Sequence, residues 1–344
     1  MTGGFSVSTI IVLCCLAAFV VAFGIVRSTI AYAHRRGMLD EPGRRRSHTI
    51  PTPRGGGLGI VAGALVGMTA ALLSLPAAPA TAVVVALFVG TVAVAGIGWW
   101  DDHGSLPVLP RLLVQLGSTA LLATALAMAG LHWLWWLPLV VAGAWSINLH
   151  NFMDGIDGLL AQQAIFVGVG LAILASASGQ VALAGAAWAL AAATLGFWWF
   201  NRSPARIFMG DVGSGTLGLV VFALTAMLWQ ADAALLWPAL MFSSGFAVDA
   251  TLTLLLRMLR GRRWYTPHRE HLYQWLVRRG ATHTRVASGY LAWNLLVTAP
   301  LAWMAFHDPA WAPWLCVALY VVAAASWWGG KRHCLRRRAR HVPA

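Results

Sequence analysis

The sequence predicts an all-α polytopic integral membrane protein with about eleven transmembrane helices. Of its 344 residues, 59% are hydrophobic and only 10% are charged, and the mean hydropathy is +0.70. Apolar runs long enough to cross a bilayer recur along most of the chain. This composition argues against the two soluble domains that the length alone would allow.

Eleven apolar segments account for these runs. Some are only about 16–18 residues long, which is tolerated because helix tilt varies. The first segment has no positive charge before it and no small-residue cleavage site, so we expect a retained helix and not a signal peptide. The expected spans are residues 5–26, 56–75, 81–100, 109–129, 133–150, 159–177, 180–200, 215–230, 234–256, 286–306 and 310–329.

The positive charges predict the orientation. All 24 Lys and Arg residues fall in the connections that follow odd-numbered spans or in the tail, and the other connections hold none. By the positive-inside rule the N-terminus is then outside and the C-terminus cytoplasmic. The net charge of +13 thus reflects topology and contact with membrane lipids, and we expect no nucleic-acid partner.

This topology predicts one transmembrane domain over residues 1–330, followed by a basic cytoplasmic tail over 331–344. Nine of the eleven carboxylates lie in cytoplasmic connections, at cytoplasmic span ends or, for Asp249, inside the ninth span. A carboxylate near the membrane is costly unless it is paired, hydrated or bound to a cation. One active site on the cytoplasmic face explains the set, built from loops 27–55, 101–111, 148–158, 201–214 and 257–285.

The stretch "WWDDHGSLP" places Asp101 and Asp102 at the end of the third span. Adjacent carboxylates repel each other unless a cation or a proton lies between them. The same pair could also be a solvated helix end, because ionisable residues are tolerated there.

The stretch "NLHNFMDGIDGL" is the richest in polar groups. Asn148 and Asn151 are three residues apart and can share one helix face. Asp154 and Asp157 follow in a turn made by glycines, which let backbone approach a ligand closely. Carboxylate and amide oxygens suit Mg²⁺ and the polar groups of a nucleotide or sugar, although these residue types are also common in simple turns.

The stretch "FMGDVGSGTLG" opens the eighth span with Gly210, Asp211 and Ser214. Free N–H groups at a helix start bind anions, and Asp211 adds a cation ligand beside them. No lysine follows the glycines, so this is not a Walker A loop. A structural glycine turn is the alternative interpretation.

The stretch "TPHREHLYQ" holds His268, Arg269 and His271 in the long basic connection after the ninth span. Two histidines without a cysteine are too few for a zinc site, whereas His and Arg donors suit a diphosphate. A basic juxtamembrane helix is the alternative. Arg54, in the basic loop "DEPGRRRSHTIPTPRGGG", is a candidate to hold a lipid phosphate.

Together these motifs resemble those of the bacterial polyprenyl-phosphate N-acetylhexosamine-1-phosphate transferases of glycosyltransferase family 4. The resemblance covers about residues 40–274. It implies transfer of a sugar-1-phosphate from a UDP-N-acetylhexosamine to undecaprenyl phosphate, with release of UMP and with Mg²⁺, or Mn²⁺ in its place, as cofactor. The product would start a lipid-linked cell-surface polysaccharide such as an O-antigen.

The resemblance also implies roles for single residues. Asp211 matches the magnesium-binding aspartate, and we assign Asp102 to the metal as well. Asp101 and Asp102 match the pair near the attacking lipid phosphate. The nucleotide-sugar segment is matched by Asn151, Asp154 and Asp157, and the basic loop near the diphosphate by His268 and His271. A phosphate monoester is largely dianionic near neutral pH, which favours single displacement over an aspartyl-phosphate route.

Some features depart from the family pattern. Consecutive histidines are absent from "HREHLYQ", which argues against a UDP-MurNAc-pentapeptide substrate, and Asp249 beside this motif favours UDP-GlcNAc, UDP-FucNAc or UDP-QuiNAc. The lysine that many members carry after the aspartate pair is missing, and Arg111 is its candidate replacement. Neither the sugar, the pathway nor a homodimer follows from the sequence.

Three other classes of protein compete with this interpretation. A transporter would line a path through mid-bilayer with charges, yet only Asp249 lies clearly within a span. A prenyltransferase or a CDP-alcohol phosphotransferase would lack the glycine-rich start of the eighth span. A scaffold without chemistry would not need costly carboxylates at the membrane edge.

Overall fold

The computed structural model describes residues 6–37, 39–40, 51–104, 106–262 and 268–339. Most of the predicted basic loop, including the three consecutive arginines at 44–46, lies outside the described residues, as do 263–267 and the end of the predicted tail.

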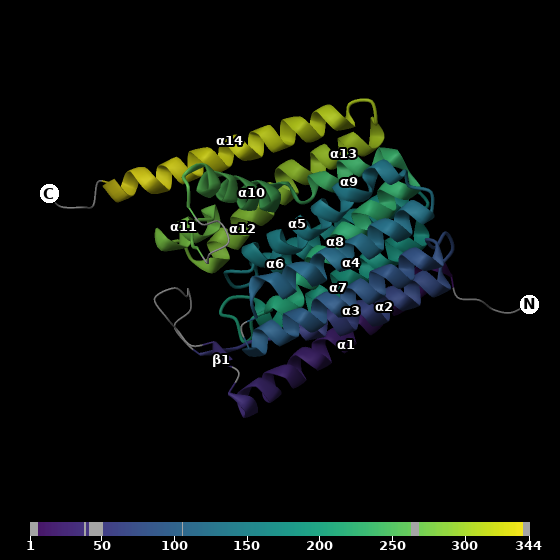
Figure 1. Ribbon diagram of the computed structural model, residues 1–344, viewed down its shortest axis with the longest axis horizontal. Helices are drawn as coiled ribbons and strands as arrows, with labels where there is room; N and C mark the ends of the chain where they lie inside the picture. The colour runs from purple at the N-terminus through teal and green to yellow at the C-terminus, as the bar shows by residue number, and fades with distance from the viewer. Residues whose placement is uncertain (1–5, 38, 41–50, 105, 263–267, 340–344) are drawn as a thin grey trace, which may run out of the picture.

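The fold is a bundle of long helices, as predicted (Figure 1). A two-residue hairpin pairs β1 (Leu39–Asp40) with β2 (Thr52–Pro53) in antiparallel register. Short helical turns η1 (Trp133–Trp135) and η2 (Ala233–Leu235) precede α5 and α9, and the π-helix η3 (Asn294–Thr298) joins α12 to α13. The α-helices are α1 (Val7–Arg36), α2 (Gly57–Ser74), α3 (Thr81–Gly104), α4 (Val108–Met128), α5 (Trp136–Met153), α6 (Leu159–Ala177), α7 (Val181–Asn201), α8 (Asp211–Ala231), α9 (Leu236–Met241), α10 (Ser244–Leu259), α11 (Leu272–Arg278), α12 (His283–Trp293), α13 (Ala299–His307) and α14 (Ala312–Ala339).

Every predicted span is helical, although fewer than eleven helices qualify as membrane spans. Within the described ranges, nine helices are long and apolar enough to cross a bilayer, and the pair α9–α10 with η2 makes a tenth. This pair is bent by 71°, where the sequence predicts one continuous span. The predicted span that is not apolar enough to qualify is α5, because its C-terminal half carries Asn148, His150 and Asn151.

Small residues let the helices of the core approach closely. Gly57 at the start of α2 faces Gly213 of α8, and a Cβ atom added to Gly57 would lie 2.2 Å from the Gly213 Cα atom. The Gly57 N–H also donates to the Met209 carbonyl oxygen at 2.9 Å. Close backbone contact between small residues is typical of helix packing in membranes, and here it fixes the start of α8.

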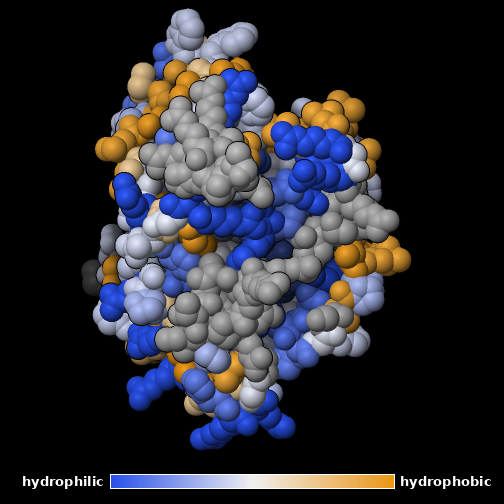
Figure 2. Space-filling view, turned by 90° about the vertical axis from the view of Figure 1, so that its left-hand side faces the viewer, coloured by the Kyte–Doolittle hydropathy of each residue, from blue (hydrophilic) through white to orange (hydrophobic). Residues whose placement is uncertain are grey.

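The predicted cytoplasmic loops gather at one end of the bundle. This end holds the hairpin, α11 and the C-terminal end of α14, whereas α1 begins at the opposite end (Figure 1). Seen end on, hydrophilic side chains are gathered across this face, with apolar side chains around them (Figure 2). We call it the polar end. The first helix begins and the last helix ends at opposite ends of the bundle (Figure 1), in agreement with the expected topology. Which end faces the cytoplasm stays a prediction.

Candidate active site

The predicted loops meet in a pocket of about 630 Å³ at the polar end. Its lining includes eight of the residues selected from sequence, contributed by four connections far apart in the chain. They are Arg54, Asn151, Asp154, Asp157, Gly210, Asp211, His268 and Arg269. Asp101, Asp102, Arg111 and Ser214 do not line the pocket but belong to the same polar network, as the contacts below establish.

Asp102, in the last turn of α3, caps the start of α8. Its two carboxylate oxygens accept hydrogen bonds from the N–H groups of Asp211 at 3.0 Å and Val212 at 3.2 Å. A negative charge at a helix N-terminus is favourable there. Gly210 makes this possible: its φ is 75°, and a Cβ atom on it would lie 2.4 Å from the Asp102 Oδ2 atom. The glycine at position 210 is therefore required by the capping aspartate.

Arg111 of α4 joins the two aspartate motifs. Its guanidinium contacts the Asp101 Oδ2 and Asp211 Oδ2 atoms, each at 2.6 Å. On the other side of Asp211, the Asn151 amide donates to Asp211 Oδ1 at 2.9 Å and to Ser214 Oγ at 3.1 Å. Arg111 thus lies where a cation is needed to offset adjacent carboxylates.

Asp154 is partly buried in the turn between α5 and α6. Burial and the negative charges of Asp211 and Asp102 raise the pKa of its carboxyl group to about 8, while Arg54 opposes the shift. If all three were ionised, these aspartates would repel one another.

The cluster formed by Asp102, Asp154 and Asp211 suits a hard divalent cation. Among the described residues, no group of three or more His, Cys, Asp or Glu side chains forms a ready-made metal cage. Mg²⁺ does not require one, because it is commonly held by one or two carboxylates together with substrate phosphates and water. A cation at Asp211 would relieve the repulsion that raises the pKa of Asp154, so the oxygen donors present fit such an ion.

Asp157 has a different environment from Asp154. Its Oδ2 atom lies 3.2 Å from His283 Nδ1 and accepts from the Ala205 N–H at 3.3 Å. Burial raises its pKa, but hydrogen bonding and the charge of His283 outweigh burial, so the pKa of Asp157 is lowered overall. His283 begins α12 and was not selected from sequence. Asp157 therefore ties the turn to α12 and to the connection after α7.

Of the two predicted histidines, His271 is buried and His268 is half-buried, and their ring centroids lie 5.0 Å apart. His268 lines the pocket, and burial together with the nearby His271 and Arg257 charges lowers its pKa to about 4. His271 is only 2% exposed, and burial lowers its pKa as well. Both imidazoles are thus neutral at neutral pH, and the positive charge of the pocket comes from Arg54, Arg269 and Arg278.

Two of the residues predicted to contact substrate lie away from the pocket. The Asn148 amide donates to Gln115 Oε1 at 2.7 Å and to the Ala144 carbonyl at 2.8 Å, facing α4 and not the pocket. Asp249 is 1% exposed and is surrounded by protein donors. Neither residue lines the pocket.

Other pocket residues were not selected from sequence. Asn201, at the end of α7, accepts a hydrogen bond from the Gly158 N–H at 3.0 Å and donates one to the Ile207 carbonyl at 2.9 Å. It thus connects the turn between α5 and α6 to the segment that precedes α8. Asp40 lines the pocket, and its Oδ1 atom lies 3.4 Å from the Arg54 Nε atom. Gln274 and Arg278 come from α11. The only sequence signal for Asn201 is an amide at the end of an otherwise apolar span.

Comparisons with known proteins show which family the chain resembles. A family model described as glycosyl transferase family 4 matches residues 84–229. The phospho-N-acetylmuramoyl-pentapeptide-transferase of Moorella thermoacetica is 32% identical over 231 residues, which cover 58% of this chain and 70% of the relative. The chain belongs to glycosyl transferase family 4.

Other members of glycosyl transferase family 4 align over more of the chain. A probable undecaprenyl-phosphate N-acetylglucosaminyl 1-phosphate transferase of Bacillus subtilis is 28% identical, covering 72% of each chain. A decaprenyl-phosphate N-acetylglucosaminephosphotransferase of Mycobacterium tuberculosis (strain CDC 1551 / Oshkosh) is also 28% identical, covering 90% of this chain and 86% of the relative. The matched family region includes both aspartate motifs and the glycine-rich motif, whereas His268 and His271 lie beyond it.

Proposed function

We propose that this family 4 member transfers an N-acetylhexosamine-1-phosphate from a UDP-sugar to undecaprenyl phosphate and releases UMP. The observation that carries the proposal is the convergence of Asp154, Asp211 and three arginines in one pocket at the polar end of a membrane bundle. Such a pocket offers cation ligands and diphosphate donors at the place where a membrane lipid can present its phosphate. The printed names of the relatives include polyprenyl-phosphate transferases.

The proposed cofactor is Mg²⁺, held by Asp211 and assisted by Asp102. When bound, the ion would neutralise negative charge on the phosphates, which is the main obstacle when two anions must react. Asn151 and Arg111 hold the Asp211 carboxylate from two sides. The protein's contribution is to keep this carboxylate at the pocket wall.

The proposed reaction is a single displacement. An oxygen of the lipid phosphate attacks the β-phosphorus of the UDP-sugar, the bond from this phosphorus to the bridging oxygen breaks, and UMP leaves with that oxygen. The second pKa of a phosphate monoester is about 6, so the nucleophile needs no general base near neutral pH. Arg54, Arg269 and Arg278 would bind the diphosphate oxygens, and neutral His268 would contribute a hydrogen bond and not a charge.

For the donor sugar we propose UDP-GlcNAc, UDP-FucNAc or UDP-QuiNAc. The basis is the sequence "HREHLYQ", which lacks the consecutive histidines associated with the pentapeptide branch. We further propose that the polar end faces the cytoplasm of the bacterial inner membrane, because this end collects the positively charged connections.

The test is an assay of the purified protein in detergent with undecaprenyl phosphate, Mg²⁺ and a panel of UDP-N-acetylhexosamines, including UDP-MurNAc-pentapeptide. We expect one UDP-sugar to give UMP and a lipid-linked sugar diphosphate in equal amounts. If a folded preparation releases no UMP from any donor, the proposed function is wrong. If only the pentapeptide donor reacts, the reaction class stands and the proposed sugar is wrong.

A further inference from the structure

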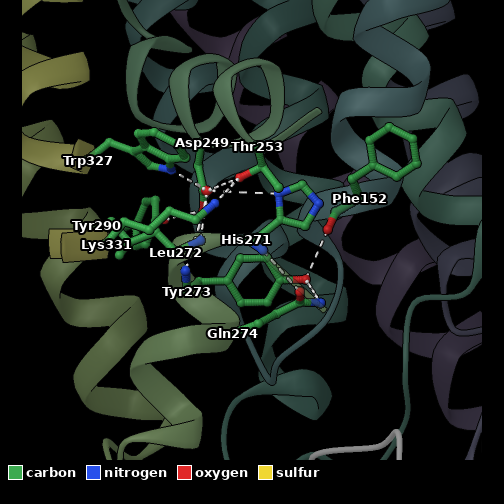
Figure 3. A network of polar contacts seen from close by, with 10 residues as sticks. All are labelled: Phe152, Asp249, Thr253, His271, Leu272, Tyr273, Gln274, Tyr290, Trp327 and Lys331. Atoms are coloured by element: carbon green, nitrogen blue, oxygen red, sulfur yellow. Dashed lines mark hydrogen bonds and ion pairs between the residues drawn. The ribbon is translucent and has the colours of Figure 1, made fainter. Parts of the chain in front are cut away.

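Asp249 fixes the start of α11 (Figure 3). Its carboxylate accepts hydrogen bonds from the N–H groups of Leu272 at 2.8 Å and Tyr273 at 3.4 Å, the first two residues of α11. The same carboxylate accepts from the Tyr290 hydroxyl of α12 and the Trp327 indole of α14, both at 2.8 Å. One buried group on α10 thus joins α11 to two further helices.

Tyr273 connects α11 to the turn that carries Asp154. Its side chain is 1% exposed, and its hydroxyl donates to the Phe152 carbonyl oxygen at 2.9 Å (Figure 3). Gln274 Nε2 donates to the same hydroxyl at 3.1 Å. Gly155 packs against the phenol so closely that a Cβ atom on Gly155 would lie 2.1 Å from the Tyr273 hydroxyl oxygen.

These contacts lie between two walls of the pocket. Gln274 and Arg278 of α11 line one wall, and Asp154 and Asp157 of the turn line another. Neither Asp249 nor Tyr273 lines the pocket. The two walls are 121 residues apart in sequence at the Tyr273–Phe152 hydrogen bond, so their relative position depends on tertiary contacts of this kind.

We propose that Asp249 and Tyr273 are positioning residues that hold α11 and the Asp154 turn in one fixed arrangement. Asp249 fixes the first turn of α11, and Tyr273 transmits that position to the turn. This inference rests on the proposed function for its catalytic consequence, because the aligned walls are those assigned to the UDP-sugar. Asp249 therefore acts through α11 and not by touching substrate.

The first test replaces Tyr273 with Phe, which removes the hydroxyl and keeps the ring. We expect kcat/KM for the UDP-sugar to fall about tenfold, mainly through KM, as expected for the loss of about one buried hydrogen bond. The matched control is Tyr320→Phe, because the Tyr320 hydroxyl donates to the Leu240 carbonyl at 3.0 Å, away from the pocket. Equal kinetics for the two variants would overturn the proposal.

A second readout does not depend on activity. Hydrogen–deuterium exchange should be faster in residues 152–158 of Tyr273→Phe than in wild type, and unchanged there in Tyr320→Phe. Unchanged exchange in Tyr273→Phe would overturn the proposal even if its kinetics changed. If wild type releases no UMP from any UDP-sugar, the proposed function fails, and the exchange comparison still decides whether Tyr273 holds the turn.

The third test probes the contact between Gly155 and Tyr273. Gly155→Ala places a methyl group against the phenol, so we expect activity to fall and exchange over residues 152–158 to increase. Tyr273→Phe removes the atom at 2.1 Å and leaves ring carbons at 2.9 and 3.0 Å. The double variant should therefore recover part of the activity lost in Gly155→Ala, because variants at contacting residues are not additive. Simple addition of the two losses would contradict the proposed contact.

Discussion

At the level of single residues, the aspartates of the site have different electrostatic environments. Burial and the charges of Asp211 and Asp102 raise the pKa of Asp154, whereas the pKa of Asp157 is lowered because its hydrogen bonds and the charge of His283 together outweigh burial. Only two residues of chain therefore lie between an aspartate that is mostly protonated at neutral pH and one that is ionised. This difference suits Asp154 to respond to a cation and Asp157 to hold the turn.

The raised pKa of Asp154 predicts a pH-dependent stability. An unfolded aspartate has a pKa of about 3.9, and the folded value is about 8, so between these values the folded state binds the proton more tightly. Stability contributed by this proton is fully present below the lower value and is lost as pH rises through about 8. The Asp154→Asn variant has no carboxyl group to titrate, so it cannot lose this contribution to stability. The Tm of Asp154→Asn minus the Tm of wild type should therefore be larger at pH 8 than at pH 5. Equal Tm differences at the two pH values, measured in detergent without divalent cation, would contradict this environment.

Residue types at regular spacing predicted the site only in part. Asn148 and Asn151 are three apart, which is about 60° around a helix, and this rotation turns Asn148 toward α4 while Asn151 reaches Asp211. The neutrality of His268 and His271 follows from burial, which no local pattern encodes. The role of Asp249 depends on donors from α11, α12 and α14, whose proximity the sequence does not reveal.

At the level of elements, the start of α8 depends on its contact with α2. A Cβ atom on Gly57 would lie 2.2 Å from Gly213 Cα and 2.9 Å from the Met209 carbonyl oxygen, and neither is a flexible side-chain end. Because α8 begins with Asp211, a shift there would also move the proposed metal ligand.

Gly57→Ala should therefore reduce both stability and activity. Overpacking of a close contact typically costs about 1–3 kcal/mol, which corresponds to a fall in Tm of a few degrees in a chain of this length. The control is Gly24→Ala on α1, where an added Cβ atom meets nothing within 4 Å. A Gly57→Ala protein with the Tm and the UMP release rate of Gly24→Ala would contradict the proposed packing.

The sequence predicted the positions of the long helices better than the bends and short helices between them. Long apolar runs identify helices because the bilayer imposes length and composition, and each predicted span contains helix. The 71° bend between α9 and α10 was not predicted, because residues 240–245 are all apolar or small. A hydropathy profile therefore shows no interruption at this bend. The short helix α11 was not predicted either, because it spans only seven residues within a basic connection.

At the level of the whole molecule, one polar end and an opposite end whose connections hold no Lys or Arg define the expected orientation. A single cysteine at position 203, between α7 and α8, should be labelled by a membrane-impermeant thiol reagent only after the cytoplasmic face is opened. A single cysteine at position 308, between α13 and α14, should be labelled in intact spheroplasts. Both positions are exposed at the ends of the bundle, and the four native cysteines would be replaced by alanine. Labelling with the opposite pattern would reverse the orientation.

The central claim is that Asp211 at the polar end carries the transfer of sugar phosphate to the lipid. The most direct test compares Asp211→Asn with Asp232→Asn, a substitution of the same kind at the opposite end, where Asp232 Oδ1 accepts from the Ala234 N–H at 2.8 Å. UMP release and lipid-linked product are measured for both variants with the UDP-sugar that wild type accepts. We predict a loss of about 10²–10³-fold for Asp211→Asn, as for other groups that stabilise transition-state charge, and rates within about twofold of wild type for Asp232→Asn. A folded Asp211→Asn protein that forms both products at the wild-type rate would contradict the account.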